Sequence, residues 1–86
     1  MNTFRLIIST PDGKLYDEKT VKLSVRGIEG ELAVLAGHIP FITSLKPCDC
    51  RVENGEGIEK TGHIDGGLLA VTNEKVTLLS GSFCWK

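Results

Sequence analysis

The residues of this chain that could bind a metal or carry redox chemistry are its cysteines and histidines. They are Cys48, Cys50, Cys84, His38 and His63. Cys48 and Cys50 are separated by one residue, so on a strand both side chains point to the same side. No C-x-x-C pair, the usual zinc-binding spacing, accompanies them. We therefore interpret Cys48, Cys50 and Val52 as one inward row in which cysteine acts as a small apolar residue. The odd number of cysteines favours a reducing compartment over a disulfide framework.

Catalysis has few candidate residues in this sequence. Acyl transfer needs a nucleophile, a base and an orienting acid in contact. Neither His38 nor His63 lies in a recognisable nucleophile motif, and we expect His63 on a solvated strand face. Glu29 and Glu31 are two apart in a loop, which is not enough to argue a general acid–base pair. Because the chain also lacks the G-x-x-x-x-G-K and G-x-G-x-x-G phosphate-binding patterns, we expect a non-catalytic protein with no cofactor and no metal.

Length and composition limit the class of protein. With 86 residues, 41% of them hydrophobic and 24% charged, the chain suits one globular domain. The net charge is −1, and no run of like charges would follow a phosphate backbone, so nucleic acid is not an expected partner. No apolar stretch approaches the ~20 residues that span a bilayer, and the first residues lack the apolar stretch and cleavage site of an export signal.

Hydrophobic residues alternate with polar ones along most of the chain, and no segment has a helical stripe. Turn signals separate the alternating segments, of which Asn54-Gly55-Glu56-Gly57 is a strong hairpin signal. The predicted strands are residues 4–9, 15–16, 20–26, 32–36, 41–45, 48–53, 58–64, 68–72 and 76–79. Short strands at this spacing predict an all-β antiparallel sandwich or flattened barrel. Residues 1–86 are expected to form this single domain.

The alternation also predicts which side chains are buried. Segment 32–36 is apolar on both sides, as expected of a strand that is buried on two faces. Elsewhere one side of each strand is apolar and should face the interior. The predicted core consists of Leu6, Ile8, Val21, Leu23, Val34, Val71, Val76 and Leu78.

The segment from Gly27 to Pro40 contains an acidic glycine-rich loop that leads into an apolar strand and a Gly-His-x-Pro turn. This segment and three others, in order, resemble the β-sandwich domain of the epsilon subunit of rotary ATP synthases. Residues 6–16 resemble the family's first hairpin. The segments Gly-Gly-Leu-Leu-Ala-Val at 66–71 and Val-Thr-Leu-Leu at 76–79 resemble two later strands. The resemblance covers nearly the whole chain and implies an antiparallel β-sandwich of about ten short strands in two sheets.

The resemblance also implies a function and partners. The family's sandwich is a central-stalk component that couples ion flow through the membrane c ring to rotation of the gamma subunit and ATP synthesis. Thr10, His38 and Thr43 match its gamma contacts, and Glu29, Gly30 and Glu31 match its contact with the c ring. The catalytic alpha and beta subunits would be indirect partners. The implied location is peripheral, on the cytoplasmic face of the bacterial plasma membrane, without insertion into the bilayer.

One departure and one alternative accompany this interpretation. Family members usually continue as a C-terminal helical hairpin that in many bacteria restrains ATP hydrolysis, and we expect no such hairpin within these residues. The alternative function is a free-standing β-sandwich that binds a small ligand or metal through His38, His63 and the cysteines. Co-purification with gamma would favour the central-stalk function, and a monomer with bound zinc or ligand would favour the alternative.

Overall fold

The computed structural model describes residues 2–37 and 39–86, which form strands without helices. In chain order the strands are β1 (Phe4–Thr10), β2 (Gly13–Thr20), β3 (Lys22–Gly27), β4 (Gly30–Leu35), β5 (Phe41–Glu53), β6 (Glu59–Val71), β7 (Lys75–Leu79) and β8 (Phe83–Trp85). Hydrogen bonds connect them in the order β2-β1-β7-β6-β5-β3-β4, and β8 pairs with β6. The predicted all-β class is confirmed.

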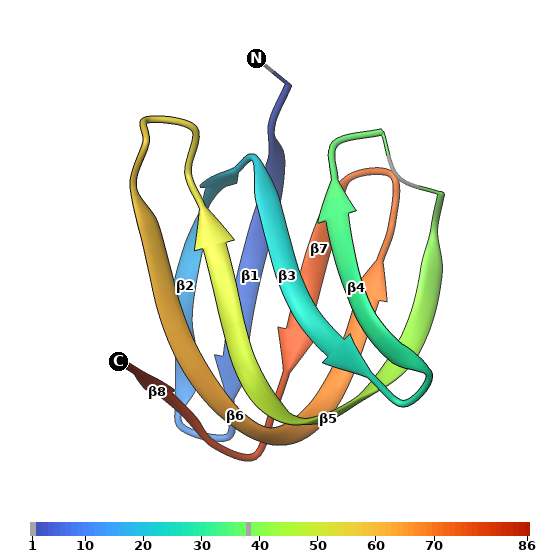
Figure 1. The fold of residues 1–86 in the computed structure, drawn as a ribbon, viewed down its shortest axis with the longest axis vertical. Helices are drawn as coiled ribbons and strands as arrows, with labels where there is room; N and C mark the ends of the chain where they lie inside the picture. The colour runs from blue at the N-terminus through green and yellow to red at the C-terminus, as the bar shows by residue number, and fades with distance from the viewer. Residues whose placement is uncertain (1, 38) are drawn as a thin grey trace.

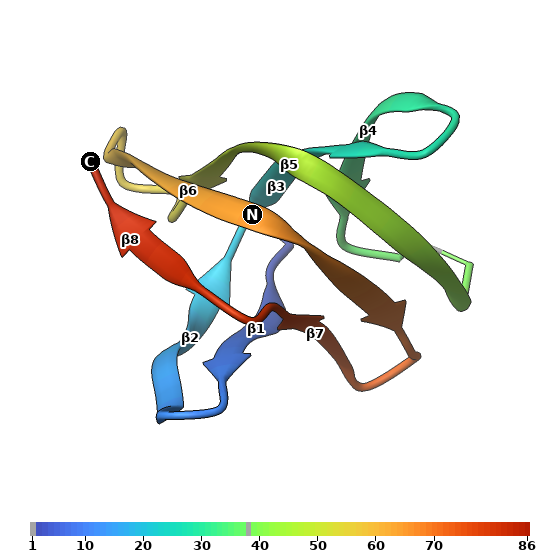
Figure 2. The ribbon, with the colours of Figure 1, turned by 90° about the horizontal axis from the view of Figure 1, so that it is seen from below.

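The strands form two layers because β5 and β6, each 13 residues long, bend and run through both (Figures 1 and 2). The first layer consists of β2, β1 and β7 with residues 68–71 of β6 and 41–45 of β5. The second layer consists of β4, β3 and β8 with residues 48–53 of β5 and 59–64 of β6. Two pairs of predicted short strands are therefore joined into two long bent ones, and the predicted sandwich of about ten short strands is confirmed in this form.

The bends occur where residue types permit them. Pro47 has no N–H, and it lies where β5 separates from β3, between the pairs Gly27–Leu45 and Ser24–Arg51. In β6 the bend falls at Gly66, whose φ is +102°, a value that L side chains rarely adopt. A side chain at the next residue, Gly67, would overlap the carbonyl oxygen of Leu79. The glycines thus let β6 change layers without breaking its pairing.

One strand pair departs from the antiparallel pattern. β1 and β7 are parallel, with Leu6 opposite Val76 and Ile8 opposite Leu78. The other strand pairs of the described residues are antiparallel. A parallel pair needs a long crossover, and here residues 11–74 supply it, so no local turn signal could have revealed this contact.

The core follows the predicted alternation with one exception. Seven of the eight predicted core residues are at most 3% exposed: Leu6, Ile8, Leu23, Val34, Val71, Val76 and Leu78. Val21 is only half-buried, so its assignment to the core was wrong. The predicted strand 20–26 is in fact divided, because Thr20 ends β2 with its side chain fully buried and Val21 lies in the bend before β3.

Strand β4 corrects a second expectation. Only Val34 is buried there, whereas Ala33 is exposed and Leu35 is 51% exposed. The prediction that this segment is buried on two faces was wrong. The physical reason is that the sandwich has two layers, so β4 packs against the other layer through its inner face and no layer covers its outer face.

An aromatic cluster joins the layers at the opposite side. The rings of Tyr16, on β2, and Trp85, on β8, meet edge to face with centroids 5.6 Å apart, and Phe83 contacts Trp85 at 4.7 Å. Lys60 places its Nζ atom 5.5 Å from the Trp85 ring centroid and 5.8 Å from that of Tyr16. Edge-to-face rings contribute beyond their buried area, so this cluster holds β8 against the sandwich.

Candidate partner-binding surface

The outer side of the first layer carries an apolar face that consists of Ile7, Ile42, Leu68, Ala70 and Leu79. Strand register places these residues in two neighbouring rows. The first row runs from Ile42 through Ala70 and the half-buried Thr77 to Ile7, which is buried, and the second consists of Leu68 and Leu79. The alternating residues of the same strands point into the core. Ile42 is 70% exposed, Leu79 43% and Leu68 37%. Contiguous exposed apolar residues of this kind mark interaction sites.

Charged side chains border the apolar face. Arg5 binds Asp17 through two hydrogen bonds of 2.8 Å, and Lys14 lies 3.2 Å from the same carboxylate. The hydrogen bonds from Arg5 hold the pKa of Asp17 well below its usual range. An apolar centre with a charged rim has the anatomy of a protein–protein interface.

Thr10 lies beside this face. A hollow of about 500 Å³ is lined by Thr10 and Pro11 together with Leu68 and Leu79 of the apolar face. The Thr10 hydroxyl accepts a hydrogen bond from the backbone N–H of Asp12 at 3.2 Å, which fixes the turn into β2. The structure therefore brings this predicted site residue next to the apolar face.

The other two predicted gamma contacts have different outcomes. Thr43 lies opposite Leu69, whose side chain is fully buried, so Thr43 points to the inner side of β5 at its edge. It is half-buried, and its hydroxyl is 3.5 Å from the carbonyl oxygen of Ser44. Its neighbour Ile42, and not Thr43, contributes to the apolar face. His38 lies outside the described residues.

The predicted acidic loop forms the tip of the β3–β4 hairpin, at the same end of the molecule as the β1–β2 turn (Figure 1). Gly27 pairs with Gly30, and Gly30 has a φ of +128° that suits glycine. Glu29 is exposed and makes no ion pair with the described residues, whereas Glu31 binds Arg26 at 3.2 Å. Ile28, 57% exposed, accompanies Glu29 at the tip. The predicted loop residues thus lie together at a protruding turn.

The cysteines are arranged as the sequence predicted. Cys50 and Val52 are buried in the core, and the half-buried Cys48 packs against it. The Cys48 thiol on β5 also accepts a hydrogen bond from the backbone N–H of Arg26 on β3 at 3.4 Å. Burial, with a smaller effect of Cys48, raises the pKa of Cys50 to about 12. A thiol that stays protonated is a packing group and not a nucleophile.

His63 belongs to a surface network. Its Nδ1 lies 3.0 Å from Asp49, which also accepts a hydrogen bond from Lys86 at 2.9 Å. These two contacts, first Lys86 and then His63, lower the pKa of Asp49. The expectation that His63 lies on an exposed face is confirmed. Across residues 2–37 and 39–86, no group of three His, Cys, Asp or Glu side chains is arranged to hold a metal ion.

Sequence reasoning missed the apolar face, although the sequence contained a signal for it. Segment 68–71 has four apolar residues in succession, and Leu78 is followed directly by Leu79. A strand that is apolar on both sides places apolar side chains on its outer side as well, where a partner can cover them. The outer residues of these strands have no covering layer within the described chain (Figure 2).

Comparison with known proteins decides the family. The family model described as "ATP synthase, Delta/Epsilon chain, beta-sandwich domain" matches residues 3–86. The chain belongs to this family. This delta/epsilon sandwich is 40% identical over 87 residues to the ATP synthase epsilon chains of Bacillus thuringiensis (strain Al Hakam) and Bacillus mycoides (strain KBAB4). These alignments cover 95% of this chain and 61% of each relative.

Solved structures contain the same sandwich. A chain of the Euglena gracilis mitochondrial ATP synthase, described with its OSCP, F1 and c-ring, superposes with a TM-score of 0.91 at 26% identity. That match covers 96% of this chain and 53% of the other. A chain from the Tetrahymena thermophila central stalk and c-ring superposes at 0.82 over 95% of this chain and 66% of the other; at 10% identity it shows the fold alone.

Proposed function

We propose that this delta/epsilon sandwich is a non-catalytic part of the central stalk of an ATP synthase, where it binds the gamma subunit and the c ring. In that position it couples ion flow through the ring to rotation of gamma and ATP synthesis. Family membership supports the assignment. The observation that carries the binding role is the exposed apolar face of the first layer.

The apolar face is the proposed gamma contact. Ile42, Leu68 and Leu79 would lose their exposed area to a partner, and each fully buried side chain of this size is worth about 1.5–3 kcal/mol. Thr10 borders the same surface. Thr43 and His38 remain predicted gamma contacts. Gamma would contact Thr43 at the open edge of β5 and not on the apolar face.

The β3–β4 hairpin tip is the proposed c-ring contact. Glu29, Gly30 and Glu31 lie at the end of the molecule that also carries the β1–β2 turn (Figure 1). Exposed charges such as Glu29 affect the rate and register of association more than its strength. The exposed Ile28 adds an apolar contact to this tip.

The proposed location follows from the proposed partners. A protein bound to gamma and to the c ring would be peripheral to the membrane, here on the cytoplasmic face of a bacterial plasma membrane. The described residues contain no helix that is long and apolar enough to cross a bilayer. Fractionation should recover the chain with membranes and release it together with the other stalk subunits.

A calorimetric titration with purified gamma tests the proposal. Ile42→Ser should weaken binding by about tenfold or more, because buried apolar anchors dominate interfaces. Ile58→Ser is the matched control, since Ile58 is 51% exposed but lies in the β5–β6 hairpin outside the apolar face. Equal affinity of both variants and wild type, or no binding of gamma by the wild type, would contradict the proposed role.

A further inference from the structure

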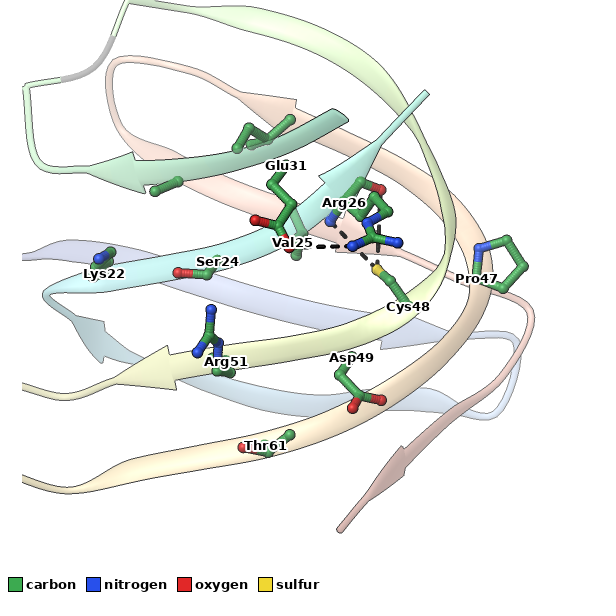
Figure 3. A pocket seen from close by; sticks show the side chains of 12 residues that line it. Lys22, Ser24, Val25, Arg26, Glu31, Pro47, Cys48, Asp49, Arg51 and Thr61 are labelled. Carbon is green, nitrogen blue, oxygen red and sulfur yellow. Dashed lines mark hydrogen bonds and ion pairs between the residues drawn. The ribbon is translucent and has the colours of Figure 1, made fainter. Parts of the chain in front are cut away.

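A polar groove crosses the outer side of the second layer, a surface separate from the apolar face. Its volume is about 670 Å³, within the range of small-molecule sites. Figure 3 shows side chains from β3, β5 and β6 converging on it. Ser24 lies opposite Arg51, and Arg51 lies opposite Thr61, so these three side chains form one row across three strands.

The acidic side chains that line the groove are already neutralised by partners. Glu31 binds Arg26 at 3.2 Å. Asp49 is held by Lys86 at 2.9 Å and by His63 at 3.0 Å. Both carboxylates therefore already have a positively charged or hydrogen-bonding partner.

Two basic side chains in the groove have no such partner. Lys22 and Arg51 make no ion pair or side-chain hydrogen bond with residues 2–37 and 39–86, although both line the groove. Lys22 is half-buried, so part of its side chain is packed along the groove wall. Lys22 and Ser24 point to the same side of β3, about 7 Å apart along the strand. An ammonium, a guanidinium and a hydroxyl group thus face one volume.

We propose that Lys22, Ser24 and Arg51 bind the phosphate group of a small anionic ligand in this groove. The guanidinium group matches two phosphate oxygens with parallel N–H donors, and the ammonium group supplies a compact positive charge. The hydroxyl groups of Ser24 and Thr61 make no hydrogen bond with the described residues and can donate to the remaining oxygens. A doubly charged phosphate uses both cations, whereas a single carboxylate would leave one unmatched.

The neighbouring Glu53 provides a further test of phosphate binding. It lies opposite Lys22 in the strand register, but no ion pair joins them. Its negative charge opposes an anion bound at Lys22. Removing this charge in Glu53→Gln should therefore increase the affinity for phosphate. If the groove were only a solvated face, phosphate would cause no saturable chemical-shift change in either the wild type or Glu53→Gln.

Amide chemical shifts measured during titration with inorganic phosphate, at constant ionic strength and pH, test the site. Saturable shifts should concentrate at residues 22–24, 51 and 61. Lys22→Gln and Arg51→Gln should each weaken the affinity about tenfold or more, and Glu53→Gln should strengthen it. Lys75→Gln is the control, because Lys75 is exposed on β7, outside the groove, and has no ion pair with the described residues. Titrations with a phosphate monoester and with acetate separate a phosphorylated metabolite from free phosphate and from carboxylates.

The outcomes distinguish this site from the proposed stalk role. Tighter binding of the monoester would identify a phosphorylated metabolite as the ligand, and equal binding would identify free phosphate. The proposal would be overturned by linear shifts spread over all lysines, by acetate binding as tightly as phosphate, or by Lys22→Gln and Arg51→Gln binding as wild type. None of these results depends on gamma, so the stalk role is tested independently.

Discussion

The backbone N–H of Ile28 donates a hydrogen bond to the carbonyl oxygen of Ser44 at 3.2 Å. This bond ties the tip of the β3–β4 hairpin to β5, beside Thr43 and Ile42. The proposed c-ring contact and one side of the proposed gamma contact are therefore parts of one connected structure. A force that the ring applies to the hairpin would reach β5 through backbone hydrogen bonds, without a flexible linker between the two surfaces.

Leu78 and Leu79 should separate folding from binding. Leu78 is fully buried, so Leu78→Ala should lower the free energy of unfolding by about 2–5 kcal/mol. Leu79 is 43% exposed on the apolar face, and Leu79→Ala should cost less than about 1 kcal/mol while weakening gamma binding. Urea denaturation followed by tryptophan fluorescence measures the first effect. Equal destabilisation by both variants would show that the described face is part of a core.

A side chain at Gly67 should destabilise the fold. A Cβ atom there would overlap the carbonyl oxygen of Leu79, which is backbone and cannot rotate away. Gly67→Ala should therefore cost about 1–3 kcal/mol. Gly81→Ala is the matched control, since its Cβ would meet open space and its φ is not in the left-handed region. Similar midpoints for the two variants in thermal unfolding would argue against the bend in β6.

The sequence predicted the class of fold and most of the core because period-two alternation reports directly which side of a strand is buried. Leu6, Ile8 and Leu23 were identified in this way. The alternation does not report which strands neighbour one another. The parallel pairing of β1 with β7 depends on contacts between distant segments, and so does the number of layers. Leu35 was therefore expected to be buried, although it lies on the uncovered outer face of β4.

The candidate site was predictable only in part, for a related reason. The turns that contain Glu29 and Thr10 follow from local glycine and proline residues, whereas the assignment of these residues as partner contacts came from the family resemblance. To predict the apolar face, one must know that Ile42, Leu68 and Leu79 lie on adjacent strands. To predict the polar groove, one must know the same of Lys22 and Arg51. Such groupings arise from register, which a single sequence without its pairing does not specify.

Asp17 should make stability dependent on pH. Its pKa in the folded protein is lowered, chiefly by hydrogen bonds from Arg5, relative to about 3.9 in an unfolded chain. The stabilisation is therefore present above about pH 4 and is lost as the pH falls through the lower folded value. The difference in unfolding free energy between wild type and Asp17→Asn should shrink as the pH is lowered from 6 to 3. Asp12→Asn, at a position with no ion pair to the described residues, is the control variant.

The cysteines should react in order of exposure. Cys84 is exposed, whereas Cys50 is fully buried and its pKa is raised to about 12. Iodoacetamide at pH 8 should therefore label Cys84 quickly and Cys50 only after unfolding, because the thiolate is the reacting form. Peptide mass spectrometry after timed quenching measures both rates. Rapid labelling of Cys50 in the native protein would contradict its place in the core.

Coupled ATP synthesis tests the proposed function most directly. An ATP synthase depleted of its epsilon chain, reconstituted in vesicles with an imposed ion gradient, should regain gradient-driven ATP synthesis when this chain is added. Ile58→Ser should restore synthesis as wild type does, and Ile42→Ser should need about ten times more protein to reach the same rate. Stable binding of the wild-type chain to the depleted complex without any recovery of synthesis would contradict a coupling role.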